Sequence, residues 1–401
     1  MSDARSQEPY QLGVPTEVYF GPGRVAELGS ILRERNHRNV LVCSDDTVAE
    51  AGILDRVEHS LRGSGLRYTL FREVQSNPDI GTVLNGTREA RSNAGPNGYD
   101  CVVGVGGGGP IDAAKAISVA LTHEGDIRDY VAYTTGQRKP ITDRTLPVVA
   151  VPTVSGAGAE ISPVAVIVDE EIGVKIGFFS QRLFPVIALV DPTLAVTVPP
   201  GTTAGSGMDI LAHAFDALVS RHGNLLSDTL AAGAVETVFQ YLRRAVRQGD
   251  DVAARGALAS ASMMGLLAIY LGKGGAVHTI GEPLGTIYSL PHGYACAVAL
   301  PAMMRFLSPV CTRELARIYR LAGNNLPQDT GLETMAEGAV RAVETLIRDI
   351  ALPQLSSIVP DPDIGGLADA SIRHLAVDRI PVELSRDKYV KLYGDIFSGS
   401  R

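Results

Sequence analysis

Gly104-Val105-Gly106-Gly107-Gly108-Gly109-Pro110-Ile111-Asp112-Ala113-Ala114-Lys115 is the stretch of sequence that decides the fold. It overlaps the end of an apolar run, residues 99–105, that predicts a buried strand, and it opens a segment that predicts a helix. Glycines let backbone N–H groups approach a pyrophosphate, and a helix start offers that group a positive end. The spacing is neither GxGxxG nor a Walker A loop, so a generic Rossmann fingerprint does not apply. The stretch favours phosphate binding over the alternative, a tight strand-to-helix turn.

The sequence around this loop alternates between short apolar runs and helical segments. We predict further strands at residues 16–20, 39–44, 68–74, 146–151, 165–169, 174–179 and 186–190. Helices are expected from the turn at 21–23 through Arg35, and over residues 47–63 and 82–94. Such alternation is typical of a parallel sheet covered on both faces. Residues 169–171 read as a hairpin turn, which predicts one antiparallel excursion.

Beyond Pro199 the sequence pattern changes to Ala/Leu-rich segments with helical periodicity, such as residues 254–270 and 334–350. We therefore predict two domains. Residues 1–199, after a polar leader, form an α/β dinucleotide-binding domain, and residues 200–401 form an all-α domain.

Bulk composition excludes several classes of function. The 401 residues include 45% hydrophobic and 20% charged residues, which indicates a globular protein with sizeable cores. The net charge of −8 gives no basic footprint for nucleic acid or an anionic membrane. Cys43, Cys101, Cys296 and Cys311 are widely spaced, which argues against a disulfide framework and a thiolate zinc site. No apolar leader is visible, so we expect a cytoplasmic protein with a small-molecule partner.

A second glycine-rich turn, residues 152–160, also follows a strand, and two such loops at strand ends define one crevice. Asp45 follows the strand at residues 39–44. There its carboxylate either binds the hydroxyls of an adenosine ribose, which favours NAD over NADP, or caps the next helix.

A metal site is predicted around a helix at residues 207–218. Asp209 and His213 are four residues apart and share one helix face. His278 and His292 bracket an apolar, Gly/Pro-broken connection that can fold back on itself. One carboxylate and three imidazoles suit Fe²⁺ or Zn²⁺, and without clustered thiolates the chain has no softer option.

These residues resemble the iron-containing (group III) alcohol dehydrogenase family along nearly the whole chain. The GGGSxxDxAK signature is matched by residues 106–115, with Gly109 where Ser is usual. The PTTxGTGSE loop is similar to residues 152–160. The GMDAxxHxxEA helix is matched around Asp209 and His213, and the final signature is matched by residues 278–293. The resemblance implies the dehydroquinate synthase-like fold of this family, with a dinucleotide-binding domain and a helical domain.

The resemblance also assigns roles to residues. It implies that the metal ligands are Asp209, His213, His278 and His292. It implies cofactor contacts from a set of residues in the first domain: Asp45, Asn77, Gly106, Gly107, Gly108, Asp112, Thr153 and Lys175. The implied cofactors are NAD, with NADP less favoured, and Fe²⁺, with Zn²⁺ as the alternative.

Two departures from the family pattern fall next to these ligands. Glu282 replaces a histidine that the family assigns to proton relay. A glutamate relays a proton if burial raises its pKa, or it approaches the metal as an extra ligand. Lys273 replaces a common glycine. It either pairs with an acidic substituent of the substrate, such as a carboxylate, phosphonate or sulfonate, or it pairs with Glu282.

The sequence thus predicts an NAD-dependent, metal-dependent oxidoreductase that interconverts a small primary or secondary alcohol and its aldehyde or ketone. Glu282 and Lys273 are the candidate catalytic residues, and a homodimer or higher homo-oligomer is expected. The alternatives are a cyclising lyase of the dehydroquinate synthase type, and a non-catalytic NAD-binding protein.

Overall fold

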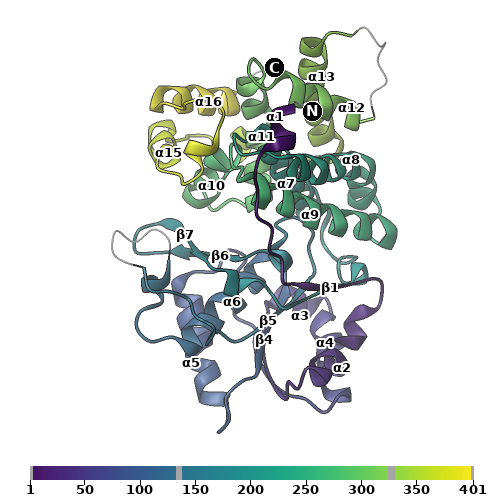
Figure 1. Cartoon of the computed structure of the whole chain (residues 1–401), viewed down its shortest axis with the longest axis vertical. Helices are drawn as coiled ribbons and strands as arrows, with labels where there is room; N and C mark the ends of the chain where they lie inside the picture. The colour runs from purple at the N-terminus through teal and green to yellow at the C-terminus, as the bar shows by residue number, and fades with distance from the viewer. Residues whose placement is uncertain (1–2, 132–137, 324–329, 399–401) are drawn as a thin grey trace. The chain divides into compact units, whose positions relative to one another are not determined.

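The computed structural model describes residues 3–131, 138–323 and 330–398. Within it the chain forms two compact units, each visible in Figure 1. The α/β unit comprises Gly13–Val154 and Gly158–Thr197, and the helical unit comprises Met1–Leu12, Ser155–Ala157 and Val198–Arg401. The predicted fold class, a parallel-sheet domain plus a helical domain, is confirmed.

Six parallel strands form the sheet of the α/β unit in the order β1-β8-β5-β4-β2-β3. The strands β2, β4, β5 and β8 are buried along their whole length, because each is a continuous apolar run covered on both faces. The predicted strands of this sheet are confirmed. They are β1 (Glu17–Phe20), β2 (Asn39–Cys43), β3 (Arg67–Phe71), β4 (Cys101–Gly106), β5 (Val148–Pro152) and β8 (Ile187–Val190).

Helices cover both faces of this sheet, and each face has its own apolar cluster. One cluster joins α5 (Ile80–Asn93) and α6 (Gly108–Thr122) to the sheet, and the other joins α2 (Leu28–Glu34) and α4 (Ile53–Gly63). The prediction of one helix over residues 47–63 is wrong. Gly52 lies at a φ of 71°, in the left-handed region, and separates α3 (Asp46–Glu50) from α4.

The antiparallel excursion is confirmed as a two-stranded hairpin of β6 (Val164–Asp169) and β7 (Val174–Phe179). Its turn contains Gly173 at a φ of 65°. Short 3₁₀ helices complete the connections; they are η1 (Arg24–Glu27), η2 (Ile127–Tyr130), η3 (Ala159–Ile161), η4 (Gln181–Leu183), η5 (Pro192–Leu194) and η6 (Val377–Arg379).

The helical unit is organised around α7 (Pro200–Val219), which packs against α8 (Leu225–Arg247), α9 (Val252–Gly272) and α11 (His292–Leu307). The segment before His292, predicted as a broken connection, is instead mostly the helix α10 (His278–Ile287), which tolerates Pro283 in its second turn. The remaining helices are α12 (Thr312–Leu321), α13 (Leu332–Asp349), α14 (Leu355–Ile358), α15 (Ile364–Ser371) and α16 (Arg386–Ser398).

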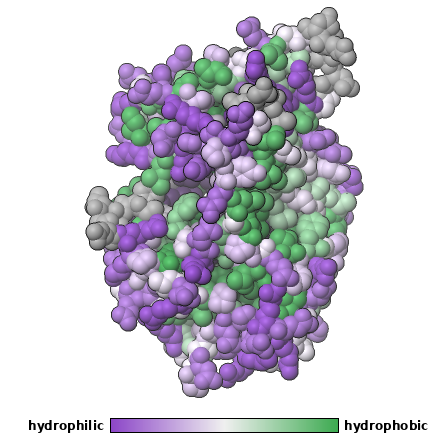
Figure 2. Space-filling view, in the orientation of Figure 1, coloured by the Kyte–Doolittle hydropathy of each residue, from purple (hydrophilic) through white to green (hydrophobic). Residues whose placement is uncertain are grey.

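One helix in the described residues, α9, is long and apolar enough to cross a membrane by length and composition alone. It packs against both α7 and α8, and half of its most apolar window is buried. Its composition is therefore explained by its place in the core of the helical unit. Figure 2 shows hydrophilic and apolar side chains together on the viewed face of the molecule.

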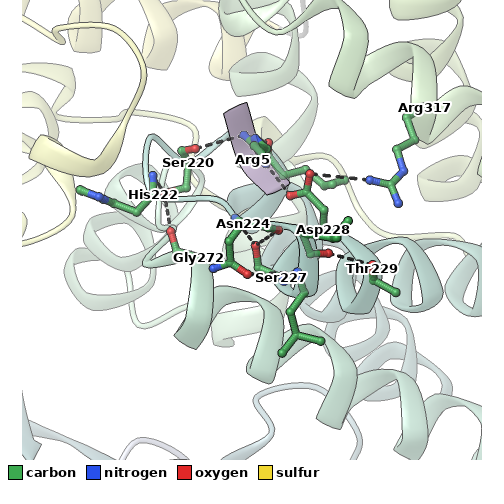
Figure 3. Close-up of polar contacts among 12 residues, drawn as sticks. Arg5, Ser220, His222, Asn224, Ser227, Asp228, Thr229, Gly272 and Arg317 are labelled. Carbon is green, nitrogen blue, oxygen red and sulfur yellow. Dashed lines mark hydrogen bonds and ion pairs between the residues drawn. The ribbon is translucent and has the colours of Figure 1, made fainter. Parts of the chain in front are cut away.

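The polar leader forms a short helix, α1 (Asp3–Gln7), that is fastened to the helical unit by Arg5 (Figure 3). The Arg5 guanidinium donates to Asp228 Oδ1 at 2.5 Å and to the carbonyl oxygens of Leu218 and Ser220 at 2.7 and 3.1 Å. Arg317 lies 3.8 Å from the other oxygen of Asp228. Arg5 therefore provides hydrogen-bond donors to the buried carboxylate of Asp228 and to carbonyl oxygens at the C-terminal end of α7.

Candidate active site

Asp209 and His213 lie on α7 four residues apart, and both are buried, with exposed fractions of 2% and 6%. Two glycines bring neighbouring helices close to this face. A Cβ on Gly293 would lie 2.4 Å from the carbonyl oxygen of Gly205, and a Cβ on Gly265 would lie 3.3 Å from that of Ile210. The start of α11 and the middle of α9 therefore approach the backbone of α7 directly.

This packing brings ligand atoms from three helices together. Asp209 Oδ1 on α7 lies 3.7 Å from His278 Nε2 on α10 and 3.6 Å from His292 Nε2 on α11. The His213 ring stacks on the His278 ring with centroids 4.8 Å apart and planes 4° apart. All four residues that the sequence predicts as ligands are thus neighbours.

The residues present fit a divalent cation. Asp209 Oδ1, His213 Nδ1 and His278 Nε2 are buried and have no hydrogen-bond partner within the described residues. Buried polar atoms without partners are costly, and a shared cation satisfies them together. Nitrogen and oxygen ligands of one tetrahedral ion lie roughly 3.4 Å apart. The distances of 3.7 and 3.6 Å from Asp209 Oδ1 to the Nε2 atoms of His278 and His292 are only slightly longer.

The electrostatics of the site favour a cation. Burial alone raises the pKa of Asp209, but the imidazoles of His213, His292 and His278 outweigh it and hold that pKa far below its usual range. Burial lowers the pKa of His213 despite the opposing effect of Asp209. The site thus combines an ionised carboxylate with a neutral imidazole donor, the protonation states that metal binding requires.

Sequence reasoning missed Asp216, which is fully buried and holds His278 in place. Its Oδ2 accepts a hydrogen bond from His278 Nδ1 at 2.7 Å, and its Oδ1 accepts one from the backbone N–H of Val277 at 2.7 Å. The bond to Nδ1 leaves Nε2 as the donor that faces Asp209. The available signal was its position three residues after His213, on the same face of α7.

Sequence reasoning also missed Cys296. Its Sγ belongs, with Asp209, His278 and His292, to a group of potential ligand atoms that all lie within 4.8 Å of one another. A thiol therefore lies beside the predicted ligands, which the absence of clustered cysteines in the sequence did not lead us to expect. The spacing of His292 and Cys296 on α11 is the same as that of Asp209 and His213 on α7, so the signal was present.

Glu282 and Lys273 are neighbours of the ligand set in sequence, but Glu282 pairs with neither Lys273 nor a ligand in the described residues. It pairs with His374, whose Nε2 lies 2.8 Å from Glu282 Oε2. Burial raises the pKa of Glu282, yet the imidazole of His374 outweighs it and lowers that pKa. The net pKa of Glu282 is thus lowered, so the condition expected for proton relay by the glutamate alone is not met. Lys273 ends α9 at a φ of 48° with its side chain exposed.

The predicted cofactor residues lie in the α/β unit, mostly beyond the carboxyl ends of the parallel strands. The chain runs from β2 to β3 on one side of β2 and then crosses to β4 on the other side, so the strand order reverses between β2 and β4. In open α/β sheets, ligands bind outside the strand ends at this reversal. Asp45 follows β2, and Gly107 and Gly108 follow β4.

The glycine loop is shaped for close approach. Gly106 lies at a φ of 148°, which favours glycine, and Gly107 caps α6. A Cβ on Gly109 would lie 2.7 Å from the carbonyl oxygen of Ser76, so the serine of the family signature would clash here. Thr153 in the second loop donates its backbone N–H to the carbonyl of Gly106 at 2.9 Å. The two loops are therefore in contact.

Lys115, the last residue of the glycine signature, fixes the end of the second loop by hydrogen bonds. Its buried ammonium donates to the carbonyl oxygens of Ala159, Ser162 and Val164 at 2.8, 2.9 and 2.7 Å. Asp112, one turn earlier, accepts from the backbone N–H of Val166 at 3.1 Å and lies 3.8 Å from Lys115. Asp112 thus has a structural role in the described residues.

The two readings of Asp45 are resolved in part. Its side chain accepts from the backbone N–H of Val48 at 2.8 Å and caps α3, so the helix-cap interpretation is confirmed. Ribose binding by this half-buried carboxylate stays a prediction. Asn77 lies half-buried in the connection after β3, and Lys175 lies half-buried on β7.

Comparisons with known proteins match nearly the whole chain. Residues 15–192 match the family described as iron-containing alcohol dehydrogenase, and residues 203–397 match its C-terminal domain. A 1,3-propanediol dehydrogenase of Klebsiella pneumoniae is 34% identical over 345 residues, which cover 85% of this chain and 86% of that protein.

Solved structures are similar over the same span. A crystal structure of a 1,3-propanediol oxidoreductase has a TM-score of 0.90 and 30% identity, and covers 97% of this chain and 100% of that one. The sulfoacetaldehyde reductase of Bifidobacterium kashiwanohense, in complex with NAD⁺, has a TM-score of 0.86 and 28% identity, and covers 97% and 99%.

Proposed function

Because the chain belongs to the iron-containing alcohol dehydrogenase family, we propose a division of labour among its residues for the reaction of that family. The protein is an NAD-dependent, metal-dependent oxidoreductase that interconverts an alcohol and its aldehyde or ketone. The observation that carries the proposal is the convergence of Asp209, His278 and His292 from three helices, with buried atoms aimed at one another.

Asp209, His213, His278 and His292 hold the metal, and Asp216 orients His278 from behind. A bound Fe²⁺ or Zn²⁺ supplies Lewis-acid polarisation of the substrate oxygen, and bound NAD supplies the hydride acceptor. Asp209 contributes the negative charge that offsets the cation. The imidazoles contribute neutral donors, so the site keeps a positive charge toward the substrate oxygen.

NAD binds across the carboxyl ends of β2 and β4. The backbone N–H groups of Gly107 and Gly108, at the start of α6, would hold the pyrophosphate, and the second carboxylate oxygen of Asp45 would accept from the adenosine ribose. Gly106, Asn77, Thr153 and Lys175 complete this surface. Asp112 supports it indirectly, because it holds β6 beside the loop.

The Glu282–His374 pair carries the proton that the alcohol releases. Glu282 is four residues from His278 on α10, and His374 lines a cavity of about 420 Å³ with Arg221, Asp378 and Glu383. The Asp378 side chain on this cavity is 82% exposed, so the cavity is open to solvent. Glu282 and His374 therefore form two steps of a path from the ligand set toward water.

A test of this path uses Glu282→Gln and His374→Asn, with Glu383→Gln on the same cavity as the matched control. Loss of a proton-transfer group lowers kcat by about 10²-fold or more. We expect that loss in the first two variants, with little change in KM and an altered pH–rate profile, and no loss in the control. Equal kcat values and pH profiles in all three variants would remove the proposal.

The Lys273 ammonium binds an acidic substituent of the substrate. Its exposed ammonium is not engaged by Glu282, and one structural relative is a sulfoacetaldehyde reductase. Lys273→Met should raise KM for aldehydes that carry a carboxylate or sulfonate and leave KM for neutral aldehydes unchanged. An equal effect on both groups of substrates would contradict this role.

We also propose that the protein is cytoplasmic and forms a homodimer or higher homo-oligomer. The edge strand β1 carries exposed Val18 and Phe20, at 41% and 40%, which favours a covered edge in an oligomer. Light scattering on the purified protein measures the assembly, and a monomer at micromolar concentration would contradict it.

The overall assignment is tested by NADH absorbance with a panel of alcohols and aldehydes on protein of known metal content. A dehydrogenase accumulates NADH with a simple alcohol. A cyclising lyase of the dehydroquinate synthase type recycles its cofactor within one turnover and accumulates none. A metal-replete, NAD-bound sample that is inert toward the whole panel would indicate a binding protein.

A further inference from the structure

Cys296 is placed among the metal ligands although no thiolate belongs to the predicted set. It lies on α11 one turn after His292 and is fully buried. Its Sγ lies 3.8 Å from His292 Nε2 and within 4.8 Å of the ligand atoms of Asp209 and His278. His213 is not a member of that group.

The separation of Cys296 Sγ from His292 Nε2 fits two ligands of a single ion. Zn–S bonds are about 2.3 Å and Zn–N bonds about 2.0–2.1 Å, so S and N ligands at a tetrahedral angle lie about 3.6 Å apart. The observed 3.8 Å between Cys296 and His292 is close to that value. Without a cation the same two atoms share a weak S–H···N contact, but Asp209 Oδ1 and His278 Nε2 beside them then have no hydrogen-bond partner in the part of the chain that the structure describes.

The position of the sulfur is set by the contact between α10 and α11. A Cβ on Gly281 would lie 3.0 Å from Cys296 Sγ and 3.2 Å from its Cα, so only glycine lets the two helices meet here. Gly281 is three residues after His278. The close contact therefore fixes the sulfur relative to His278 and His292.

We propose that Cys296 is a further metal ligand, which adds one sulfur to the coordination set of Asp209, His213, His278 and His292. The inference rests on the proposed metal site and concerns its donor atoms. Thiolates favour Zn²⁺ and Co²⁺, so the sulfur shifts the preference of the site away from an all-N/O set. On binding, the metal replaces the thiol proton, which passes to solvent.

Cobalt substitution tests the proposal by a readout other than activity. Co²⁺ bound to a thiolate gives a sulfur-to-metal charge-transfer band in the near ultraviolet, and bound Co²⁺ gives ligand-field bands in the visible region. The variant is Cys296→Ser, which keeps the size of the side chain. The matched control is Cys311→Ser, because Cys311 is also buried in the helical unit but lies outside the ligand group.

We expect the charge-transfer band in the wild type and in Cys311→Ser, and its loss in Cys296→Ser. Zn²⁺ affinity should fall by about tenfold or more in Cys296→Ser, and by less for Fe²⁺. Visible bands without a charge-transfer band in the wild type would overturn the proposal and leave the metal site intact. No Co²⁺ binding at all would instead overturn the proposed metal site.

Zinc K-edge absorption on the wild type needs no variant, so a folding defect in Cys296→Ser does not remove the test. A scatterer at about 2.3 Å indicates a sulfur ligand. A first shell containing only scatterers at about 2.0–2.1 Å would overturn the proposal.

Discussion

Asp216→Asn is the sharpest test of how the helical unit builds its metal site. Both carboxylate oxygens of Asp216 accept, one from Val277 N–H and one from His278 Nδ1, each at 2.7 Å. An amide offers one acceptor and one NH₂ group. While His278 Nδ1 keeps its proton, the NH₂ group meets a donor whichever way the amide turns, and Asp216 is fully buried, so water cannot intervene.

The expected loss follows from that one bond. A hydrogen bond to a charged group contributes about 1.5–3 kcal/mol. At about 1.4 kcal/mol per factor of ten, the Kd for the metal should rise by about 10- to 100-fold. The amide also favours the His278 tautomer whose Nε2 carries the proton, and that tautomer cannot donate to a metal.

The measurement is a competition titration of Zn²⁺ against a chromophoric chelator, with folding checked by circular dichroism. Asp228→Asn is the matched control, because it alters a buried carboxylate of the same unit that pairs with Arg5. The control should lower the melting temperature and leave the metal Kd unchanged. A folded Asp216→Asn protein with the wild-type Kd would refute the reasoning.

Three further predictions concern the α/β unit. Asp45→Gly should narrow the kcat/KM preference for NAD over NADP, because a carboxylate repels a 2′-phosphate; an unchanged ratio would leave Asp45 only a helix cap. Lys115→Met should lower the free energy of unfolding by about 3 kcal/mol in urea titration, because three buried carbonyls lose their donor. Burial raises the pKa of Glu160 from 4.5 to about 7, so the native state binds more protons in this window and stability falls as pH rises through it. Glu160→Gln should flatten that decline in melting temperature, and an identical pH dependence would contradict it.

Local patterns were enough to predict the sheet and the long helices, because apolar runs and helical periodicity are read from neighbouring residues. Gly52 shows where that fails, since nothing local distinguishes a glycine inside a helix from one that breaks it. The connection before His292 was misjudged for a related reason: Pro283 and the glycines suggested a break, but packing on α11 stabilises the helix.

The site was predictable to the extent that its residues share a helix or a family motif. Asp209 and His213 were found by their spacing, and the spacing of His292 and Cys296 carried the same information. The partner of Glu282 was not predictable, because His374 is 92 residues away and only tertiary structure brings the two together. Arg5 and Asp228, 223 residues apart, were hidden for the same reason.

The ligands come from α7, α10 and α11, so a bound cation ties together helices that lie far apart along the chain. Asp209 and His292 enclose a loop of roughly 80 residues, and closing so long a loop costs the unfolded chain considerable entropy. The ion therefore acts as a removable cross-link within the helical unit. Chelation should lower the melting temperature of the helical unit by mass action and spare the sheet, so that one thermal transition separates into two.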